Sequence, residues 1–185
     1  IMGEVTADEL YTSSRRHAMA YEEGGADAVR VETFYAIDEA EQAIKAVKEN
    51  TSLDVLCTFT FDKTKDGFKT LMGITPQQMT ESLILCGADV VGANCGTGFD
   101  DMIEIVSNIR SVSSQIPILV QANAGLPIIQ DGNLVYSETP EKIKESIPRI
   151  IEEGVNIIGG CCGTTPEHIK VISEIAKSYN KKYRY

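Results

Sequence analysis

The sequence predicts an α/β fold in which helices cover a parallel β-sheet. Five short apolar segments rich in β-forming residues alternate with longer amphipathic segments that carry helix signals. The five segments are continuously apolar rather than alternating, which is typical of parallel strands buried on both faces. An open doubly wound sheet and a barrel of eight strand–helix units both fit this pattern.

The predicted strands are the apolar segments themselves. We place them at Ala28–Thr33, Val55–Phe61, Asp89–Asn94, Ile118–Ala122 and Val155–Gly159. Three of them follow a helix end marked by a glycine, in the runs that contain Gly25, Gly87 and Gly154. Glycine favours the left-handed residue that ends a helix and turns the chain back.

The predicted helices lie before, between and after these strands. Thr6 and Glu9 form a capping-box pair, and Thr75-Pro76 places proline at a first helical position. We expect helices from Thr6 towards Glu23, over Asp38–Glu49, from Thr75 to about Cys86, and over Asp100–Ser111, Pro140–Glu153 and Thr165–Ser178.

Composition and charge exclude several classes of partner. The net charge of −10, with 27 acidic and 17 basic residues, disfavours binding to nucleic acid or to an anionic membrane. No apolar run approaches the roughly 20 residues that span a bilayer, and no signal peptide opens the sequence. Five cysteines, an odd number, indicate free thiols in a reducing compartment, so we expect a cytoplasmic protein.

Three cysteines stand where predicted strands end. Cys95 follows the third strand, and Cys161 and Cys162 follow the fifth between glycines. Because the carboxyl ends of parallel strands meet at one edge, these thiols are expected to come together there. Three thiolates can hold zinc and leave one coordination position open, as catalytic zinc sites do. We interpret Cys57 and Cys86 as small hydrophobic residues.

Four motifs stand in order along the chain and resemble those of the homocysteine S-methyltransferase family. They are Glu32-Thr33-Phe34, Gly92-Ala93-Asn94-Cys95, Asn123-Ala124-Gly125 and Gly159-Gly160-Cys161-Cys162-Gly163-Thr164. The likeness is greatest to the homocysteine-binding module of cobalamin-dependent methionine synthase. It implies a (β/α)8 TIM barrel, of which this chain would hold about strands four to eight. Residues 1–179 would then form the C-terminal portion of a homocysteine-binding barrel, followed by a basic tail at 180–185.

The resemblance also implies roles for individual residues. Cys95, Cys161 and Cys162 match the family's zinc ligands, and Glu32 matches the acidic residue that binds the amino group of homocysteine. Asn94 and Asn123 match polar positions at the same mouth, although hydrogen bonding within their own loops is an equal alternative.

Two residues depart from the family pattern. Ala122 replaces the usual proline before the Asn-Ala-Gly step, and Arg30 stands where an apolar residue is usual. Arg30 shares a strand face with Glu32, so it could pair with Glu32, reach a substrate carboxylate or face outward. The abrupt start at Ile1-Met2-Gly3 suggests a cut through a longer protein, and the family's Asp-Gly motif after strand one has no counterpart here.

The implied activity is zinc-dependent methyl transfer to the thiol of homocysteine, which gives methionine. Zinc would hold the substrate as a nucleophilic thiolate, so no protein general base is required, and His17 and His168 are interpreted as surface residues of helices. The expected donor is a methylated corrinoid on a separate domain or protein, although relatives use betaines or S-methylmethionine. The charged loop Asp62–Lys69 is a candidate contact for such a partner.

Three other functions stay open. The chain could be a non-catalytic or incomplete zinc-binding barrel fragment, a thiol-based redox or metal-buffering protein, or a phosphate-binding barrel enzyme. Adjacent cysteines such as Cys161 and Cys162 form a disulfide only with strain, which disfavours the redox hypothesis. A phosphate site would not need the cysteines, so Cys→Ser changes would separate it from the zinc hypothesis.

Overall fold

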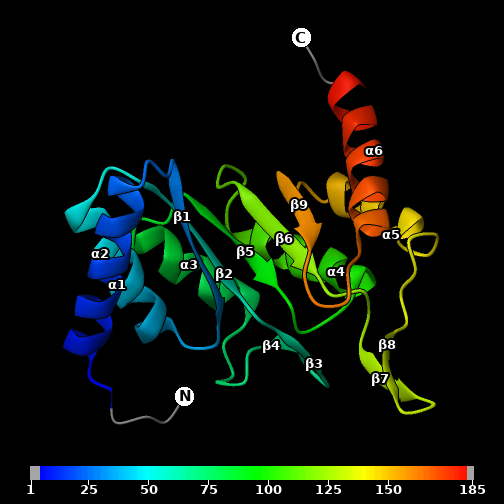
Figure 1. Ribbon diagram of the computed structural model, residues 1–185, viewed down its shortest axis with the longest axis horizontal. Coiled ribbons are helices and arrows are strands. Elements are labelled where there is room, and N and C mark those ends of the chain that lie inside the picture. Colours follow the sequence, from blue (N-terminus) through cyan, green and yellow to red (C-terminus); the bar gives the residue numbers. More distant parts are fainter. Residues whose placement is uncertain (1–4, 183–185) are drawn as a thin grey trace.

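The computed structural model describes residues 5–182 of the chain, with side chains described up to residue 179. Helices and strands alternate along it (Figure 1). The helices are α1 (Ala7–Glu23), α2 (Ile37–Asn50), α3 (Pro76–Leu85), α4 (Phe99–Val112), α5 (Ile143–Glu152) and α6 (Pro166–Lys182). The strands are β1 (Ala28–Phe34), β2 (Asp54–Phe59), β3 (Asp62–Thr64), β4 (Gly67–Lys69), β5 (Val90–Asn94), β6 (Ile118–Ala122), β7 (Pro127–Gln130), β8 (Asn133–Tyr136) and β9 (Ile157–Gly160).

The main sheet of the described residues has five parallel strands in the order β1-β2-β5-β6-β9. These are the five strands that the sequence predicts, and the α/β class with a parallel sheet is confirmed. The order in space is the order along the chain. A doubly wound sheet reverses its strand order at a switch point, and this sheet has no such reversal.

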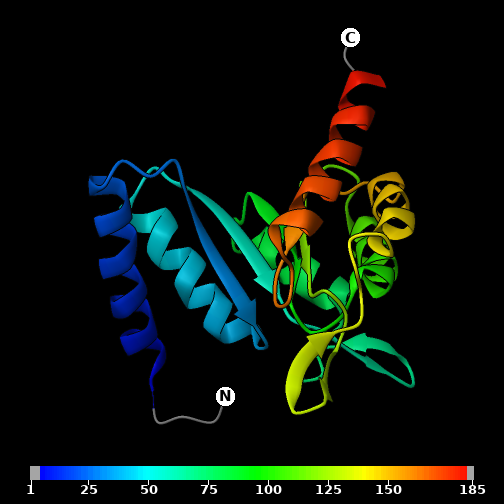
Figure 2. The same ribbon diagram turned by 45° about the vertical axis from the view of Figure 1, so that its right-hand side comes forward.

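The helices lie in one layer around one face of the sheet. α1 packs on α2, and from α2 to α6 each helix contacts the next one along the chain. Figures 1 and 2 show this row of helices following the sheet from β1 to β9. The hydrophobic core fills the space between the helices and the sheet; its largest fully buried side chains are Phe59, Phe61, Phe99, Ile44, Met79, Leu83, Met102, Ile105, Ile109, Ile118, Ile143 and Ile147.

The sheet curls toward its other face. Arg30 in β1 donates a hydrogen bond to Gln121 in β6, although β2 and β5 lie between these strands. Three strand spacings amount to about 14 Å in a flat sheet, and side chains stand roughly perpendicular to it. The two side chains therefore meet only because β1 and β6 tilt toward each other over this concave face.

Local sequence accounts for the helix ends. Thr6 and Glu9 form the predicted capping box, and Thr75 with Gln78 forms a second one in front of Pro76. The turns back to the strands use Gly25, Gly87 and Gly154, whose φ angles are 82°, 87° and 99°. Each of these glycines thus occupies the left-handed region that the sequence pattern predicts.

Two β-hairpins were not predicted. The expected loop Asp62–Lys69 is the antiparallel pair β3–β4, and the segment after β6 contains the pair β7–β8. In the second hairpin Asp131 and Gly132 have φ angles of 50° and 76°. An Asp-Gly pair with two positive φ angles is the usual two-residue hairpin turn. The first hairpin has an Asp-Gly pair as well, but Asp66 lacks a positive φ and Gly67, with φ 96°, is the first residue of β4, so the pair indicates a turn there without fixing its type.

The ends of the chain add two observations. Helix α6 continues to Lys182, so its backbone runs past Tyr179, where the sequence suggests that a tail begins. Residues 180–182 of the expected tail at 180–185 thus belong to α6. The rest of that tail, 183–185, lies outside the described residues, as does the start at Ile1-Met2-Gly3. Among the helices that the structure describes, none combines the length and apolar character needed to cross a membrane.

Candidate metal centre

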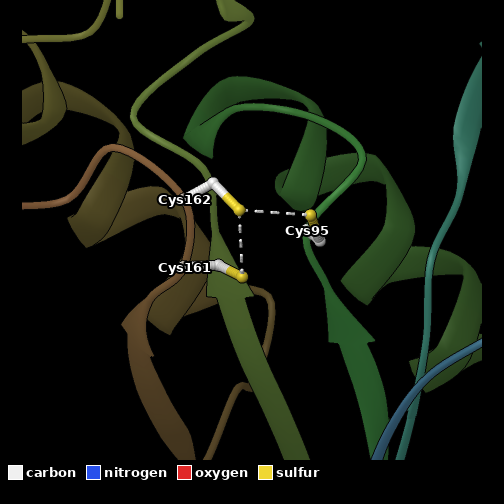
Figure 3. A group of neighbouring side chains, drawn as sticks. All are labelled: Cys95, Cys161 and Cys162. Carbon is white, nitrogen blue, oxygen red and sulfur yellow. Dashed lines mark hydrogen bonds between the residues drawn. The ribbon is translucent and has the colours of Figure 1, made fainter.

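Cys95, Cys161 and Cys162 meet at the carboxyl edge of the sheet, as the sequence predicts. Cys95 directly follows β5, and the other two directly follow β9. The sulfur of Cys162 lies 3.7 Å from that of Cys95 and 4.0 Å from that of Cys161. All three sulfurs lie within 4.8 Å of one another. Figure 3 shows the three thiols turned toward a common point.

The spacing of the sulfurs fits a tetrahedral zinc ion. With a Zn–S bond of about 2.3 Å, two thiolate ligands of one zinc lie about 3.8 Å apart. Among the described residues, no further Cys, His, Asp or Glu joins the group. Cys162 is exposed, so the cluster is open to solvent on its side. Three ligands with an open fourth position are the arrangement of a catalytic rather than a structural zinc site.

Strand β6 fixes two of these cysteines through its backbone. The amide of Cys95 donates to the carbonyl of Gln121 over 3.0 Å, and the amide of Cys161 donates to that of Ala122 over 2.7 Å. Both bonds extend parallel ladders that the strands have already formed. The register of β6 therefore sets the relative height of the two cysteine loops.

Asn123 and Ala124 hold the third cysteine. The amide of Cys162 donates to the Asn123 side-chain oxygen over 3.0 Å, and its carbonyl accepts from the amide of Ala124 over 2.9 Å. Asn123 is buried, so its carbonyl oxygen is used for this bond rather than exposed at the mouth. Asn123 therefore positions a candidate ligand directly.

The glycines around the cysteines are required by close packing. Gly163 has φ 76°, and a Cβ there would lie 2.2 Å from the ring of Tyr136 in β8. Gly96 has φ 68°, and a Cβ there would lie 2.4 Å from the carbonyl oxygen of Phe61. Any larger residue would displace the cysteine loop on which it stands.

The thiols of the cluster influence one another. The hydrogen bond to Cys95, partial burial and the nearby Cys161 together raise the pKa of the Cys162 thiol to about 11. The remaining cysteines differ in setting: Cys57 is fully buried among the core residues of β2, and Cys86 is half-buried at the end of α3. Their burial agrees with the interpretation of both as small hydrophobic residues.

Asn94 is a structural bridge between three strands. Its side-chain oxygen accepts from the amide of Thr33 over 3.0 Å and from the hydroxyl of Thr58 over 2.7 Å. Its side-chain nitrogen donates to the Thr33 hydroxyl over 2.8 Å. Asn94 is almost completely buried, so these bonds occupy most of its hydrogen-bonding capacity.

Thr33 has a backbone conformation that a β-branched residue rarely adopts. Its φ is 68°, and the pairing of β1 with β2 is irregular between Val31 and Phe34. A non-glycine residue in this region costs about 1–3 kcal/mol and needs compensating contacts. The two bonds from Asn94 supply them, and Asn94 precedes Cys95, which itself has φ 60°. Glu32 and the cysteine cluster are thereby tied to each other.

Glu32 lies on the concave face, and its neighbour Arg30 lies beside it. The two side chains form an ion pair of 2.5 Å, and each is about two-fifths exposed, at 38% for Arg30 and 41% for Glu32. Arg30 also donates to Gln121, whose carbonyl oxygen holds Cys95. Of the alternatives open for Arg30, the structure shows pairing with Glu32 and orientation into the concave face.

His168 is not a surface residue, which corrects the sequence-based interpretation; His17 is exposed on α1 as predicted. His168 is only 5% exposed. Its Nδ1 accepts from the amide of Thr165 over 3.1 Å, so its Nε2 carries the proton and donates to the carbonyl oxygen of Glu138 over 2.8 Å. The contact that buries it comes from a residue 30 positions away, which no local pattern reveals.

Glu138 links the loops that carry the cysteines. Its carboxylate accepts from the amide of Phe99 over 2.9 Å, just after the Cys95 loop, and its amide donates to Ala124 over 2.9 Å. Its carbonyl holds His168, which follows the double cysteine. Burial raises the pKa of the Glu138 carboxyl, although the bond from Phe99 opposes this. Sequence reasoning missed Glu138 altogether.

Comparison with known proteins gives consistent matches. A family model described as homocysteine S-methyltransferase matches residues 1–176. The methionine synthase of Mycobacterium leprae is 31% identical over 171 residues, and that of Mycobacterium tuberculosis is 29% identical over 182 residues. The metallated form of the homocysteine methyltransferase MmuM from Escherichia coli superimposes with a TM-score of 0.75 at 18% identity.

The chain covers only part of each of these proteins. The alignments take in 89% and 95% of this chain but 14% and 15% of the two methionine synthases. The superposition takes in 94% of this chain and 54% of MmuM. At this identity the structural match establishes a shared fold and no more.

We expect Asn94→Ala to destabilise the protein by about 2–4 kcal/mol, because it leaves the Thr33 amide and the Thr58 hydroxyl without their acceptor. Thr33→Gly removes the hydroxyl that accepts from the Asn94 side-chain nitrogen, so one of the bonds broken by Asn94→Ala is already absent, and that change should cost about 1 kcal/mol less in this background. Urea unfolding of the two single variants and the double variant measures this coupling. Asn108→Ala is the control, and its effect should add to that of Thr33→Gly. If the effects of Asn94→Ala and Thr33→Gly on the free energy of unfolding simply add, the bonds between Asn94 and Thr33 do not stabilise the protein.

We expect His168→Ala to weaken metal binding by roughly ten- to a hundredfold, as removal of groups that orient metal ligands commonly does. His168→Asn keeps an acceptor near Nδ1 for the Thr165 amide but loses the donor to Glu138, so its affinity should be intermediate. Competition with a chelator measures the affinity of each variant for zinc. His17→Ala, on the exposed face of α1, is the matched control. Equal affinities for His168→Ala and His17→Ala would show that the Glu138–His168 contact does not position the cysteines.

Proposed function

The chain belongs to the homocysteine S-methyltransferase family, and we propose that it carries the zinc-binding and homocysteine-binding part of an enzyme that methylates the homocysteine thiol to give methionine. The observation that carries this proposal is the cluster of Cys95, Cys161 and Cys162 with one open side. The methionine synthases that the chain resembles support the choice of substrate.

We propose that the parallel sheet is part of a TIM barrel, corresponding to about strands four to eight within residues 1–179. Three observations support this: the sequential strand order, the single layer of helices, and the curl that brings Arg30 to Gln121. The chain superimposes on 54% of MmuM, as expected if it forms about half of such a barrel. We propose that residues 180–185 are a C-terminal extension beyond the barrel, although 180–182 continue helix α6.

The proposed roles of the three cysteines follow from their chemistry. As thiolates they hold zinc, which supplies a Lewis acid that binds the substrate sulfur in its deprotonated, nucleophilic form. Three anionic sulfur ligands leave the metal electron-rich, so the bound thiolate keeps much of its nucleophilicity. The protein's task is to keep the three ligands at the required spacing, which the bonds from β6 and Asn123 do.

The proposed substrate contacts lie next to the cluster. The carboxylate of Glu32 accepts from the ammonium group of homocysteine, and its partial exposure on the concave face supports this role. Asn94 and Asn123 are assigned to the mouth of the same site, where their bonds to Thr33 and to Cys162 support a positioning role. A zinc ion held by Cys95, Cys161 and Cys162 would favour the deprotonated form of the thiol, so no side chain would need to act as a general base.

The methyl donor that we propose is a methylated corrinoid carried by another domain or protein. The likeness to two methionine synthases supports it, and each of these proteins is far longer than the matching segment. The hairpin β3–β4 at the loop after β2 is a candidate contact for the donor-carrying partner. The free cysteines support a reducing compartment, and we propose a cytoplasmic location without nucleic-acid or membrane partners.

We expect the chain, purified without oxygen, to contain close to one zinc per molecule, and Cys161→Ser to lose most of it because two thiolates hold zinc poorly. Cys86→Ser, which changes a half-buried cysteine outside the cluster, is the matched control and should keep its zinc. Elemental analysis measures the zinc content. Full zinc in Cys161→Ser would contradict the site, and no zinc in a wild-type chain that unfolds cooperatively would contradict the function.

We expect the zinc-containing enzyme to convert homocysteine to methionine with methylcobalamin, because the donor we propose is a corrinoid. Mass spectrometry of the product measures this, and S-methylmethionine serves as the comparison donor. Turnover with S-methylmethionine alone would replace the corrinoid assignment and keep the methyl transfer. Zinc binding without turnover of any donor, in the presence of the missing barrel strands, would favour the non-catalytic fragment.

A further inference from the structure

Arg30 is a charged residue in an apolar part of the concave face. Its register neighbours are Leu56 in β2 and, next along, Val90 in β5. Its guanidinium forms an ion pair with Glu32 of 2.5 Å and also bonds the side chain of Gln121. An arginine here needs partners for its charge, and both partners lie at the proposed substrate site.

The guanidinium of Arg30 reaches along the concave face toward a residue that also holds a cysteine. The backbone of Arg30 is in register with Leu56 and through it with Val90, four residues before Asn94 in β5, whereas Gln121 is level with Asn94 in β5 and with Gly159 in β9. A strand rises about 3.3 Å per residue, so the bond to the Gln121 side chain brings the guanidinium to a residue whose backbone lies about 3 Å below Cys95 and about 7 Å below Cys161. A thiol two methylene groups from an α-carbon spans roughly 5 Å from sulfur to carboxylate, given C–C bonds near 1.5 Å.

We propose that Arg30 binds the α-carboxylate of the substrate, so that Arg30 and Glu32 together form a site for an amino-acid zwitterion. The proposal rests on the function proposed above, and it adds a recognition element for the carboxylate. The substrate ammonium takes the place of the guanidinium at Glu32, and the substrate carboxylate takes the place of Glu32 at Arg30. Every charge keeps a partner of opposite sign during this exchange.

The geometry of Arg30 supports the exchange. One nitrogen of the guanidinium bonds Gln121 and another bonds Glu32. A guanidinium has five N–H donors, so the donors that remain can bind a carboxylate while the bond to Gln121 keeps the guanidinium in position. The partial exposure of both charged side chains gives a ligand access to them. A ligand with only one of the two charges would leave Arg30 or Glu32 without its partner.

Three thiols distinguish the contribution of the substrate carboxylate from that of the amino group, in a binding experiment on the zinc-loaded protein. Homocysteine carries both charged groups, 3-aminopropane-1-thiol lacks the carboxylate, and 4-mercaptobutyrate lacks the amino group. Isothermal titration of each thiol into wild-type protein and into Arg30→Met, Arg30→Lys, Glu32→Gln and Arg16→Met gives the dissociation constants. Arg16 lies on the exposed face of α1 and serves as the arginine control.

We expect Arg30→Met to bind homocysteine roughly ten- to a hundredfold more weakly than wild type, as loss of a hydrogen bond to a charged group implies. Its affinity for 3-aminopropane-1-thiol should stay the same or rise, because Glu32 no longer has to give up Arg30 to bind the amino group, so the preference for homocysteine over that thiol should disappear. Arg30→Lys should restore part of the preference, and Arg16→Met should behave as wild type. Glu32→Gln should instead lose the preference for homocysteine over 4-mercaptobutyrate.

Three results would overturn the assignment of Arg30. If Arg30→Met weakens homocysteine and 3-aminopropane-1-thiol equally, Arg30 only positions Glu32. If wild type binds the three thiols equally, the ion pair is not a substrate site, although thiol binding at the metal would still support the proposed function. If no thiol binds the zinc-loaded protein, the proposed function itself fails, and the role of Arg30 fails with it.

Discussion

The candidate metal centre depends on the position of one strand. β6 lies between β5 and β9, and its last two carbonyls hold the loops of Cys95 and Cys161. A slip of one residue on either side would move a cysteine by about 3.3 Å and reverse the direction of its side chain. Sulfurs that lie 3.7 and 4.0 Å apart would not survive such a shift. The core packed on β6 therefore fixes the spacing of the three sulfurs, because it fixes the register of β5, β6 and β9.

Two residues at the carboxyl ends of the strands are held under local backbone strain. Thr33 and Cys95 are non-glycine residues with positive φ, and both stand at the edge where the site forms. Asn94 connects them, since it bonds Thr33 and is covalently joined to Cys95. Its near-complete burial is explained by these bonds, which occupy most of its hydrogen-bonding groups beside the candidate ligand Cys95. The side-chain amide of Asn94 therefore connects β1 to the loop that follows β5 and carries Cys95.

The main sheet and the thiol cluster were predictable because each depends on a simple rule. Continuously apolar segments after glycine turns indicate parallel strands, and parallel strands bring their carboxyl ends, here followed by Cys95, Cys161 and Cys162, to one edge. The hairpin at Asp131-Gly132 was equally readable from its turn pair.

Other features had no local signal. The burial of His168 depends on a carbonyl 30 residues away, and the pairing of Arg30 with Gln121 spans 91 residues. Both arise from the curl of the sheet and the path of the chain between β8 and α5. Sequence patterns report neighbours along a strand or helix, whereas these contacts join elements that only the tertiary fold brings together.

The distribution of charge at the mouth gives Arg30 a further physical significance. Three thiolates around a divalent cation carry a net charge of −1, and Glu32 adds another negative charge on the same concave face. The proposed substrate, which carries a carboxylate and a thiol, would have to approach this negative region, in a chain whose overall net charge is −10. A single guanidinium at the level of Gln121 offsets one of these charges where the dielectric constant is lower than in water. An apolar residue at position 30 would leave Glu32 alone with the substrate carboxylate nearby, and two like charges at short range oppose binding. Arg30, which departs from the family pattern, thus places a positive charge where negative charges are closest together in the proposed site.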